Sequence, residues 1–415
     1  MRPRTLSITF QYLTCVIFQR ALIFHQTWQE AIPHQFPRIQ GTWPRWKPPV
    51  FLRNKTVELI QDSELKGPPS SEERLKDGHD PGVVWLLRSH DPSVRYFALT
   101  ELADNRADSS EVEKTRRLIP KGSRVRTLLD DQQPDGGFGV HPYQKWTGAH
   151  WRLVSLVELG VGEGFRPAVK ATDLILKWLL GEAHLGNVPR INGLYRRCAS
   201  QEGNALAVCS RLGIAQDPRV RRLAESLMKW QWPDGGWNCD RREEARHSSF
   251  NESLSTLWGL FEYYHATGDI AVRESVEKAA EFFLKHRIFR SCRTGEERPP
   301  ETFHSRIRRS IHPFTELHYP LYWHYDILQA LSILHRAGKL GDPRTREAIE
   351  LVESKRGEDG RWRPEGYYWS LQRKKQAKLA VSNVEVVDWG RNGPNEMITL
   401  NALRVLKAAG RLREG

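Results

Sequence analysis

The feature that most constrains the fold of this chain is a short turn sequence that recurs along it. The turn reads QWPDGGW at residues 231–237, QQPDGGFG at 132–139 and, in degenerate form, KRGEDGRW at 355–362. Pro233 ends a helix, the Asp-Gly-Gly segment reverses the chain because glycine accepts a positive φ, and Trp237 supplies a large apolar anchor. A copied turn of this kind predicts a repeat of helix pairs that each end in the same reversal.

Helical patterns at a steady spacing agree with such a repeat. Six apolar stretches begin after a Gly, Pro, Asn or Asp, and they span residues 91–103, 148–160, 202–213, 251–264, 324–338 and 395–410. Charged amphipathic stretches alternate with them, most clearly at 165–181, 217–232, 270–286 and 342–356. Residues 79–415 divide into six units of about 56 residues, which is enough for two helices and two loops each. We predict an all-α fold with apolar helices inside and amphipathic helices outside.

The first 78 residues have a different pattern. They are Pro-rich and show no sustained period, which predicts a poorly structured or linker-like segment ahead of one large domain at 79–415. MRPR followed by LSITFQYLTCVIF imitates a signal peptide, but polar residues interrupt the apolar run, which is too short to span a bilayer. The sequence leaves open whether this segment is a signal, a linker or a mis-assigned start.

The charge and the cysteines bound the partners and the compartment. A formal charge of +13 would suit an anionic partner such as nucleic acid, anionic lipid or a diphosphate. The basic runs are short and lack interleaved aromatic residues, so we do not expect nucleic-acid binding, whereas peripheral membrane contact stays open. Five cysteines at irregular spacing do not form a disulfide framework and indicate a reducing compartment, which we take as the cytoplasm. The oligomeric state is left open.

The turns QWPDGGW and QQPDGGFG resemble the repeat of the squalene-cyclase and protein-prenyltransferase superfamily. With the six helix pairs, the resemblance covers residues 80–410. It implies an α/α toroid of six inner and six outer helices around a central cavity that takes an isoprenoid or another apolar small molecule. The superfamily includes terpene cyclases, prenyltransferases and non-catalytic relatives, so the resemblance does not determine the reaction.

The chain departs from both catalytic patterns of that superfamily. The D-x-D-D motif of class II cyclases is absent from the sequence, and the acids at 130, 131 and 135 are one residue off a D-D-x-x-D motif. In NESLSTLW, Glu252 occupies the place of the prenyltransferase zinc-binding Asp, but Leu254 replaces the Cys. His324 matches the late zinc-binding His. The resemblance therefore does not carry that zinc site over intact.

In a toroid with parallel inner helices, the helix N-termini meet at one mouth, where their partial positive charges favour anions and carboxylates. Acids fall in the first turn of four predicted inner helices, where each either caps its helix or acts in catalysis. A histidine-rich segment, LHYPLYWHYD at 317–326, lies beside one of them. The candidate catalytic residues are Glu202, Glu252, His318, His324, Asp326 and Glu396.

Aromatic and polar residues beside these helices are the candidates for substrate binding. Aromatic rings there either line an apolar pocket and face a carbocation or belong to the core. Arg391 either holds an anionic group or forms an ion pair with Asp388. The substrate-binding candidates are His150, Trp151, Trp258, Trp323, Tyr325, Asp388, Trp389 and Arg391.

A metal site different from that of the prenyltransferases is also conceivable. Cys198 precedes one predicted inner helix, and Cys239 and Asp240 precede the next. Thiolates and carboxylates are zinc ligands, and three protein ligands plus water form a catalytic zinc site. The alternative is that these cysteines are ordinary buried thiols.

Three functions follow from these patterns. The first is an enzyme that acts on an isoprenoid or similar apolar substrate by acid–base or metal-assisted chemistry. The second is a non-catalytic module that binds a hydrophobic ligand. The third is an (α/α)6 carbohydrate-acting enzyme with Glu252 and Asp326 as paired carboxylates.

Overall fold

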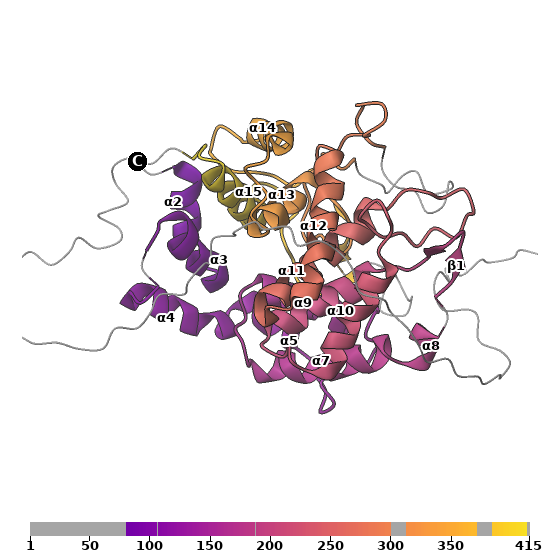
Figure 1. The fold of residues 1–415 in the computed structure, drawn as a ribbon. Coiled ribbons are helices and arrows are strands. Elements are labelled where there is room, and N and C mark those ends of the chain that lie inside the picture. Colours follow the sequence, from indigo (N-terminus) through magenta and orange to yellow (C-terminus); the bar gives the residue numbers. More distant parts are fainter. Residues whose placement is uncertain (1–79, 106, 187, 300–312, 372–383, 413–415) are drawn as a thin grey trace, which may run out of the picture. The chain divides into compact units, whose positions relative to one another are not determined.

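Apolar helices form the centre of the computed structural model, which describes residues 80–412 except 106, 187, 300–312 and 372–383 (Figure 1). The six predicted apolar stretches are all helical, which confirms the all-α class. They are α3 (Pro92–Phe97) continued by the π-helix η1 (Ala98–Leu102), α6 (Ala149–Glu158), α9 (Ser200–Arg211), α11 (Phe250–Thr267), α13 (Ile327–Arg336) and α15 (Glu396–Ala408). We call these the inner helices. The predicted linker at 1–78 lies outside the described residues.

Amphipathic helices alternate with the inner helices along the chain. They are α2 (Pro81–Leu87), α5 (Ser123–Leu129), α7 (Arg166–Leu179), α10 (Pro218–Trp230), α12 (Ile270–Lys285) and α14 (Arg346–Ser354). We call these the outer helices. In α10, for example, Val220, Leu223 and Leu227 are buried at the spacing of one helix face, whereas α9 is buried on nearly every residue. The two burial patterns agree with the predicted inner and outer layers.

Short elements complete the described chain. The helices α4 (Ser110–Leu118) and α8 (Glu182–Leu185) and the 3-10 helix η2 (Ile119–Lys121) were not predicted, whereas the 3-10 helix η4 (Pro343–Thr345) falls within the predicted stretch 342–356. β1 (Arg190–Ile191) pairs antiparallel with β2 (Leu194–Tyr195), with Arg190 opposite Tyr195. β3 (Ser370–Leu371) pairs parallel with β4 (Val384–Glu385), with Ser370 opposite Val384. No helix among the described residues is long and apolar enough to cross a membrane.

An Asp-Pro pair starts several of these helices. The Asp217 carboxylate accepts a hydrogen bond from the Arg219 backbone N–H at 2.8 Å, and Pro218 takes the first helical position. The pair works because the aspartate satisfies an otherwise unpaired N–H, while proline has no N–H to satisfy and its φ already suits a helix. Asp80, Asp91 and Asp342 act in the same way.

The repeated turn joins each outer helix to the next one. The Gln231 side-chain amide donates to the backbone oxygen of Gly235 at 2.8 Å and to that of Ser275, in the next outer helix α12, at 2.9 Å. In the first copy, Gln132 donates to Gly136 at 3.0 Å and to Pro167, in α7, at 2.9 Å. The glutamine of the motif is therefore a structural brace.

The tryptophan that ends the turn is an anchor. The Trp237 indole N–H donates to the Leu227 backbone oxygen at 2.9 Å, and that of Trp362 donates to the Val352 oxygen at 2.7 Å. Both side chains are at most 1 % exposed. Each indole therefore fastens its turn to the outer helix that precedes it, and the prediction that residues 231–237 are scaffold agrees with these contacts.

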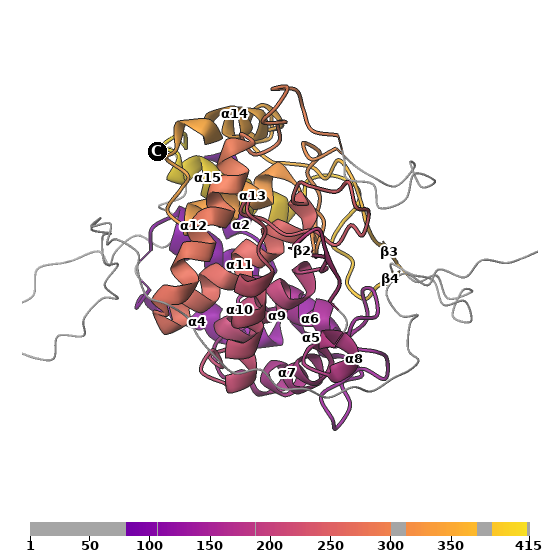
Figure 2. The ribbon, with the colours of Figure 1, turned by 45° about the vertical axis from the view of Figure 1, so that its right-hand side comes forward.

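The helix contacts return from the end of the chain to its start. Between α6 and α15, each inner helix contacts the next, and α15 contacts α2, α3 and η1. α15 lies beside α2 in both views (Figure 1, Figure 2). The third turn packs on α2 so closely that a Cβ on Gly82 would lie 2.4 Å from the Gly360 backbone oxygen. These are the contacts that the predicted toroid requires, although the complete ring of twelve helices stays a prediction.

Charged side chains lie near the C-terminal ends of the inner helices, one from each helix. Three are glutamates and three are arginines: Glu101, Glu158, Arg211, Glu262, Arg336 and Arg404. Arg336 pairs with Glu262, and Arg404 pairs with Glu101, so the last inner helix is joined to the first. Arg211 interacts electrostatically with Glu158 and Glu262. The three positive and three negative charges offset one another.

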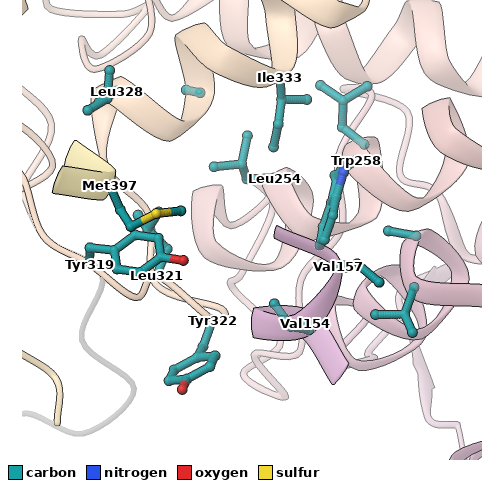
Figure 3. Packing of buried hydrophobic residues seen from close by; sticks show 14 of the residues in the cluster. Val154, Val157, Leu254, Trp258, Tyr319, Leu321, Tyr322, Leu328, Ile333 and Met397 are labelled. Carbon is teal, nitrogen blue, oxygen red and sulfur yellow. The ribbon is translucent and has the colours of Figure 1, made fainter. Parts of the chain in front are cut away.

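Apolar side chains from several inner helices face a common interior (Figure 3). Val154 and Val157 extend from α6, Leu254 and Trp258 from α11, and Met397 from α15. The segment before α13 adds Tyr319, Leu321 and Tyr322, and all of these side chains are at most 5 % exposed. The interior is therefore rich in aromatic and aliphatic groups, as the sequence predicted.

Candidate functional site

The closest helix pair in the fold brings two predicted sites together. A Cβ on Gly203 of α9 would lie 2.6 Å from the Ser255 backbone oxygen of α11, and one on Gly259 would lie 2.2 Å from the Gly203 oxygen. Only glycine permits backbones to approach this closely. The N-terminal ends of α9 and α11 are consequently held side by side, and the loops that precede them meet there.

Asn238 connects those two loops. Its backbone oxygen accepts a hydrogen bond from the Arg197 N–H at 3.0 Å, and its side-chain amide donates to the His247 oxygen at 2.8 Å. Cys198 follows Arg197 directly and Cys239 follows Asn238 directly, so the same bridge places the two cysteines near one another.

Cys198, Cys239 and Glu252 converge at this junction. The two sulfur atoms and a Glu252 carboxylate oxygen all lie within 4.8 Å of one another. The Cys239 thiol lies 3.6 Å from Glu252 Oε1, and Oε2 accepts a hydrogen bond from the Ser200 N–H, at the start of α9, at 3.0 Å. Glu252 is buried, whereas both cysteines are half-buried. Among the described residues, this is the one place where three or more His, Cys, Asp or Glu side chains lie close enough to hold a metal ion together.

Asp240, predicted as a third metal ligand, is not part of the cluster. Its carboxylate binds the Arg242 side chain at 2.5 Å and the Arg242 backbone N–H at 3.0 Å. These hydrogen bonds hold the pKa of Asp240 below its ordinary value. The prediction that Asp240 belongs to the metal cluster was wrong, because its carboxylate closes a local turn with Arg242. The carboxylate in the cluster is that of Glu252, from the neighbouring helix.

Glu202, one turn after Cys198, lies in a second polar cluster. Its Oε1 accepts hydrogen bonds from Arg197 Nη2 at 2.5 Å and Nε at 3.0 Å, and lies 3.0 Å from His184 Nε2. Burial alone would raise the pKa of Glu202, but Arg197 and then His184 outweigh it and hold the pKa below its ordinary value. Glu202 is therefore a carboxylate at neutral pH. Sequence reasoning missed Arg197 and His184.

His150 lies beside this cluster at the start of α6. Its ring is 1 % exposed and packs 4.6 Å from Trp151, 5.7 Å from Tyr143 and 5.9 Å from Trp178, measured between ring centroids. Burial lowers the pKa of His150 to about 3, so the imidazole is neutral. His150 also interacts electrostatically with Glu202 and His184.

Asp326 and His318 lie together before α13. Asp326 is the N-cap of α13 and accepts hydrogen bonds from the backbone N–H groups of Gln329 at 2.8 Å and His318 at 3.1 Å. Burial raises the pKa of Asp326 to about 7, although these two bonds act in the opposite direction. His318 Nδ1 lies 3.4 Å from the Asp326 carboxylate. The capping role explains why an acid stands at this position.

The segment between Tyr322 and Tyr325 reaches the first turns of α9 and α11. The Tyr322 backbone oxygen accepts from the Asn204 side chain at 3.1 Å, and the Tyr325 N–H donates to Asn251, next to Glu252, at 2.8 Å. Between them, Trp323 stacks on His324 at 4.0 Å, and His324 stacks on Tyr368 at 3.4 Å. We call these three half-buried rings the aromatic stack. The backbone on either side of Trp323 and His324 therefore contacts α9, which follows Cys198, and α11, which contains Glu252.

Glu385 is a buried acid that sequence reasoning missed. It is 2 % exposed and accepts a hydrogen bond from the Tyr322 hydroxyl. Burial raises the pKa of Glu385 to about 7, and burial also raises that of Tyr322 well above its ordinary value. The available signal was an acid flanked by valines in the segment VEVV at 384–387.

The other predicted residues make packing and hydrogen-bond contacts within the described chain. Trp151, Trp258, Tyr325 and Trp389 are at most 3 % exposed core side chains rather than open pocket walls. Glu396 accepts from Ser89 at 2.6 Å and from Arg124 at 2.8 Å. The Asp388–Arg391 ion pair, one of the two alternatives for Arg391, is not found among the described residues. Asp388 accepts from the Gly390 N–H at 2.9 Å, and Arg391 packs 4.7 Å from the Trp369 ring centroid.

Comparisons with known proteins give few relatives. No protein-family model matches this chain, and no curated protein matches it. Two solved structures are similar to it, each at 15 % sequence identity. A crystal structure of a protein from Actinoplanes covers 80 % of this chain and 98 % of its own, with a TM-score of 0.37. The type II terpene cyclase MstE from Scytonema, in its apo form, covers 82 % and 99 %, with a TM-score of 0.35. At these values, neither comparison assigns a residue or a reaction to this chain.

Proposed function

We propose that this protein is a zinc-dependent enzyme whose metal is held by Cys198, Cys239 and Glu252. The observation that carries the proposal is that two sulfur atoms and a carboxylate oxygen lie within 4.8 Å of one another. Their residues come from two loops and a helix, and the first and last are 54 positions apart in the sequence. The proposed site also has a structural reason to persist, because the α9–α11 glycine contact and the Asn238 bridge hold its three donors in place.

The donor set favours zinc over other common metals. Thiolates are soft ligands that calcium and magnesium do not select, and Zn²⁺ binds mixtures of thiolate and carboxylate. A bound zinc ion would act as a Lewis acid on a substrate heteroatom or would activate a water molecule. The chain's own contribution is to fix Glu252 through the Ser200 N–H at 3.0 Å and to keep the cysteines half-buried, within reach of a substrate.

An apolar substrate, such as an isoprenoid, suits the surroundings of the proposed centre. Trp323 and His324 of the aromatic stack lie between two backbone groups that bind Asn204 of α9 and Asn251 of α11, and Asn251 directly precedes the proposed ligand Glu252. Aromatic faces bind apolar chains and favour developing positive charge. The resemblance of the repeated turns to those of terpene cyclases and prenyltransferases gives independent support for this substrate class.

Metal analysis of the purified protein tests the proposal. We expect about one zinc per chain, and loss of that zinc in Cys198→Ser and Cys239→Ser. Replacing a residue that only hydrogen-bonds to a metal ligand already lowers metal affinity by about 10–100-fold, so replacing a ligand itself should cost at least as much. Replacing zinc with cobalt should produce sulfur-to-cobalt charge-transfer absorption.

Cys292→Ser is the matched control, because Cys292 is an exposed thiol outside the cluster. It should keep both the zinc and the cobalt absorption. A wild-type protein that binds no zinc after reconstitution, or a Cys198→Ser variant that retains it, would show that the three side chains do not form a metal centre.

A further inference from the structure

Two deeply buried polar side chains near the proposed centre have polar atoms without a hydrogen-bond partner among the described residues. They are Glu202, whose Oε2 is unpartnered, and His150, whose two ring nitrogens are both unpartnered. Glu202 is 0 % and His150 1 % exposed, and the two side chains interact electrostatically. Since more than nine in ten buried polar groups find a partner, three unpartnered atoms on two interacting side chains indicate a missing third component.

The charge states of Glu202 and His150 determine which hydrogen-bonding group the missing component must have. Arg197 and His184 occupy Oε1 of Glu202, so Oε2 remains as the acceptor of an ionised carboxylate. The neutral His150 ring can donate from one nitrogen and accept at the other. A ligand group that donates a hydrogen bond satisfies this arrangement, whereas an anion such as a diphosphate would be repelled by the carboxylate.

The walls of the same region are aromatic. Trp178 packs 5.9 Å from His150 and 4.9 Å from His184, again between ring centroids, and Tyr143 covers another side of His150. Small-molecule sites typically have this composition, with a few polar groups placed among apolar and aromatic side chains. The polar pair would orient the head of a ligand while the rings contact its apolar body.

We infer that Glu202 and His150 bind the hydroxyl or amine head of an apolar molecule, and that this site does not accept an anionic head. The inference rests on the proposed function, because it assigns the polar end of that enzyme's substrate. Glu202 lies one helical turn after Cys198, so such a head would be bound beside the proposed metal centre. Alcohol and amine share the required chemistry, since both donate a hydrogen bond to a carboxylate.

Three ligands with one tail and different heads test the inference. Farnesol, farnesylamine and farnesyl diphosphate are titrated into the zinc-loaded protein, and binding is followed by tryptophan fluorescence, to which Trp151 and Trp178 contribute near the site. We expect the alcohol or the amine to bind at least about tenfold more tightly than the diphosphate, in line with the cost of an unpaired buried charge.

Two variants localise the binding. Glu202→Gln should weaken farnesylamine by about 10–100-fold and farnesol by less, because a hydrogen bond to a charged group is the stronger one. His150→Phe keeps the aromatic packing and should weaken both ligands even if Glu202→Gln fails to fold. Glu262→Gln is the control, because Glu262 also pairs with an arginine but lies near the other end of an inner helix.

The outcomes separate this inference from the proposed function. If zinc binds but none of the three ligands does, the orphaned atoms enclose only water, and the inference is overturned while the metal centre stands. Preferred binding of the diphosphate, or unchanged affinities in both variants, overturns it as well. If zinc is absent and farnesol still binds through His150, the metal proposal fails and the head-group site remains.

Discussion

At the scale of the residue, the buried pair Tyr322–Glu385 illustrates how the fold determines a protonation state. Glu385 is 2 % exposed, and the cost of burying its charge exceeds what the hydrogen bonds from the Tyr322 hydroxyl and the Val386 and Val387 backbone N–H groups offset. Its pKa is consequently about 7, against an ordinary value of 4.5. Near neutral pH the Glu385 side chain, which is bonded to Tyr322, therefore populates both its protonated and its ionised form.

This shift predicts a pH dependence of stability. Between about pH 4.5 and 7 the folded chain holds a proton on Glu385 that the unfolded chain has lost, so the free energy of unfolding falls as pH rises. The contribution is fully present below pH 4.5, is lost through pH 7, and amounts to about 3 kcal/mol. Urea unfolding at pH 5 and pH 8 should show this loss in the wild type and a smaller loss in Glu385→Gln. Equal losses in both proteins would mean that Glu385 titrates normally.

The residue scale also shows what the sequence could predict. Cys198 and Cys239 were predicted as metal ligands and Glu252 as a catalytic residue, because their residue types suit that chemistry and each precedes or opens a predicted inner helix. Asp240 also has a suitable residue type and also precedes a predicted inner helix, yet its carboxylate binds Arg242, two residues later. Position in the sequence indicates which loop an acid occupies, but it does not indicate whether the carboxylate faces the neighbouring helix or its own turn. That choice depends on tertiary contacts such as the Asn238 bridge.

At the scale of the element, the α9–α11 pair connects packing to the site. The predicted segments 202–213 and 251–264 agree with the observed helices to within three residues at each end, because their apolar patterns are long and regular. Their close contact was not predicted, since the two glycines become meaningful only when they are known to face one another. The short helix α4 was missed because it has too few turns for a period to emerge, and the predicted stretch 91–103 gave no sign that its second half is a π-helix.

A methyl group at this contact should separate the two helices. Alanine at position 203 or 259 improves helix propensity by about 1 kcal/mol, but its Cβ would lie 2.2–2.6 Å from backbone atoms that cannot move independently. We expect Gly203→Ala and Gly259→Ala to lower the free energy of unfolding by about 1–3 kcal/mol or more and to weaken zinc binding. Chemical denaturation and zinc titration measure the two effects.

The control for this pair is Gly162→Ala, because no atom lies within 4 Å of the added Cβ. It should change neither the stability by more than a few tenths of a kcal/mol nor the zinc affinity. If Gly259→Ala were destabilised but bound zinc normally, the helix contact would support the fold without positioning the ligands.

At the scale of the whole molecule, the decisive contacts are those between the last and the first helices of the described chain. The third copy of the turn packs on α2, and Arg404 of α15 pairs with Glu101 of η1. An open array of helix pairs would instead expose its terminal repeats and would unfold from its ends. The copied turn predicted the helix pairs, but their number alone could not distinguish a closed ring from an open array.

Hydrogen exchange after one substitution distinguishes the two arrangements. Gly82→Ala places a Cβ 2.4 Å from the Gly360 backbone oxygen, where the third turn packs on α2, whereas Gly341→Ala has no atom within 4 Å and serves as control. In a closed ring the loss of this contact should lower amide protection in distant helices such as α9 as much as in α2, by about 1–3 kcal/mol. Loss confined to α2 and its neighbours would instead identify an open array, because each helix pair would then depend only on the pairs beside it.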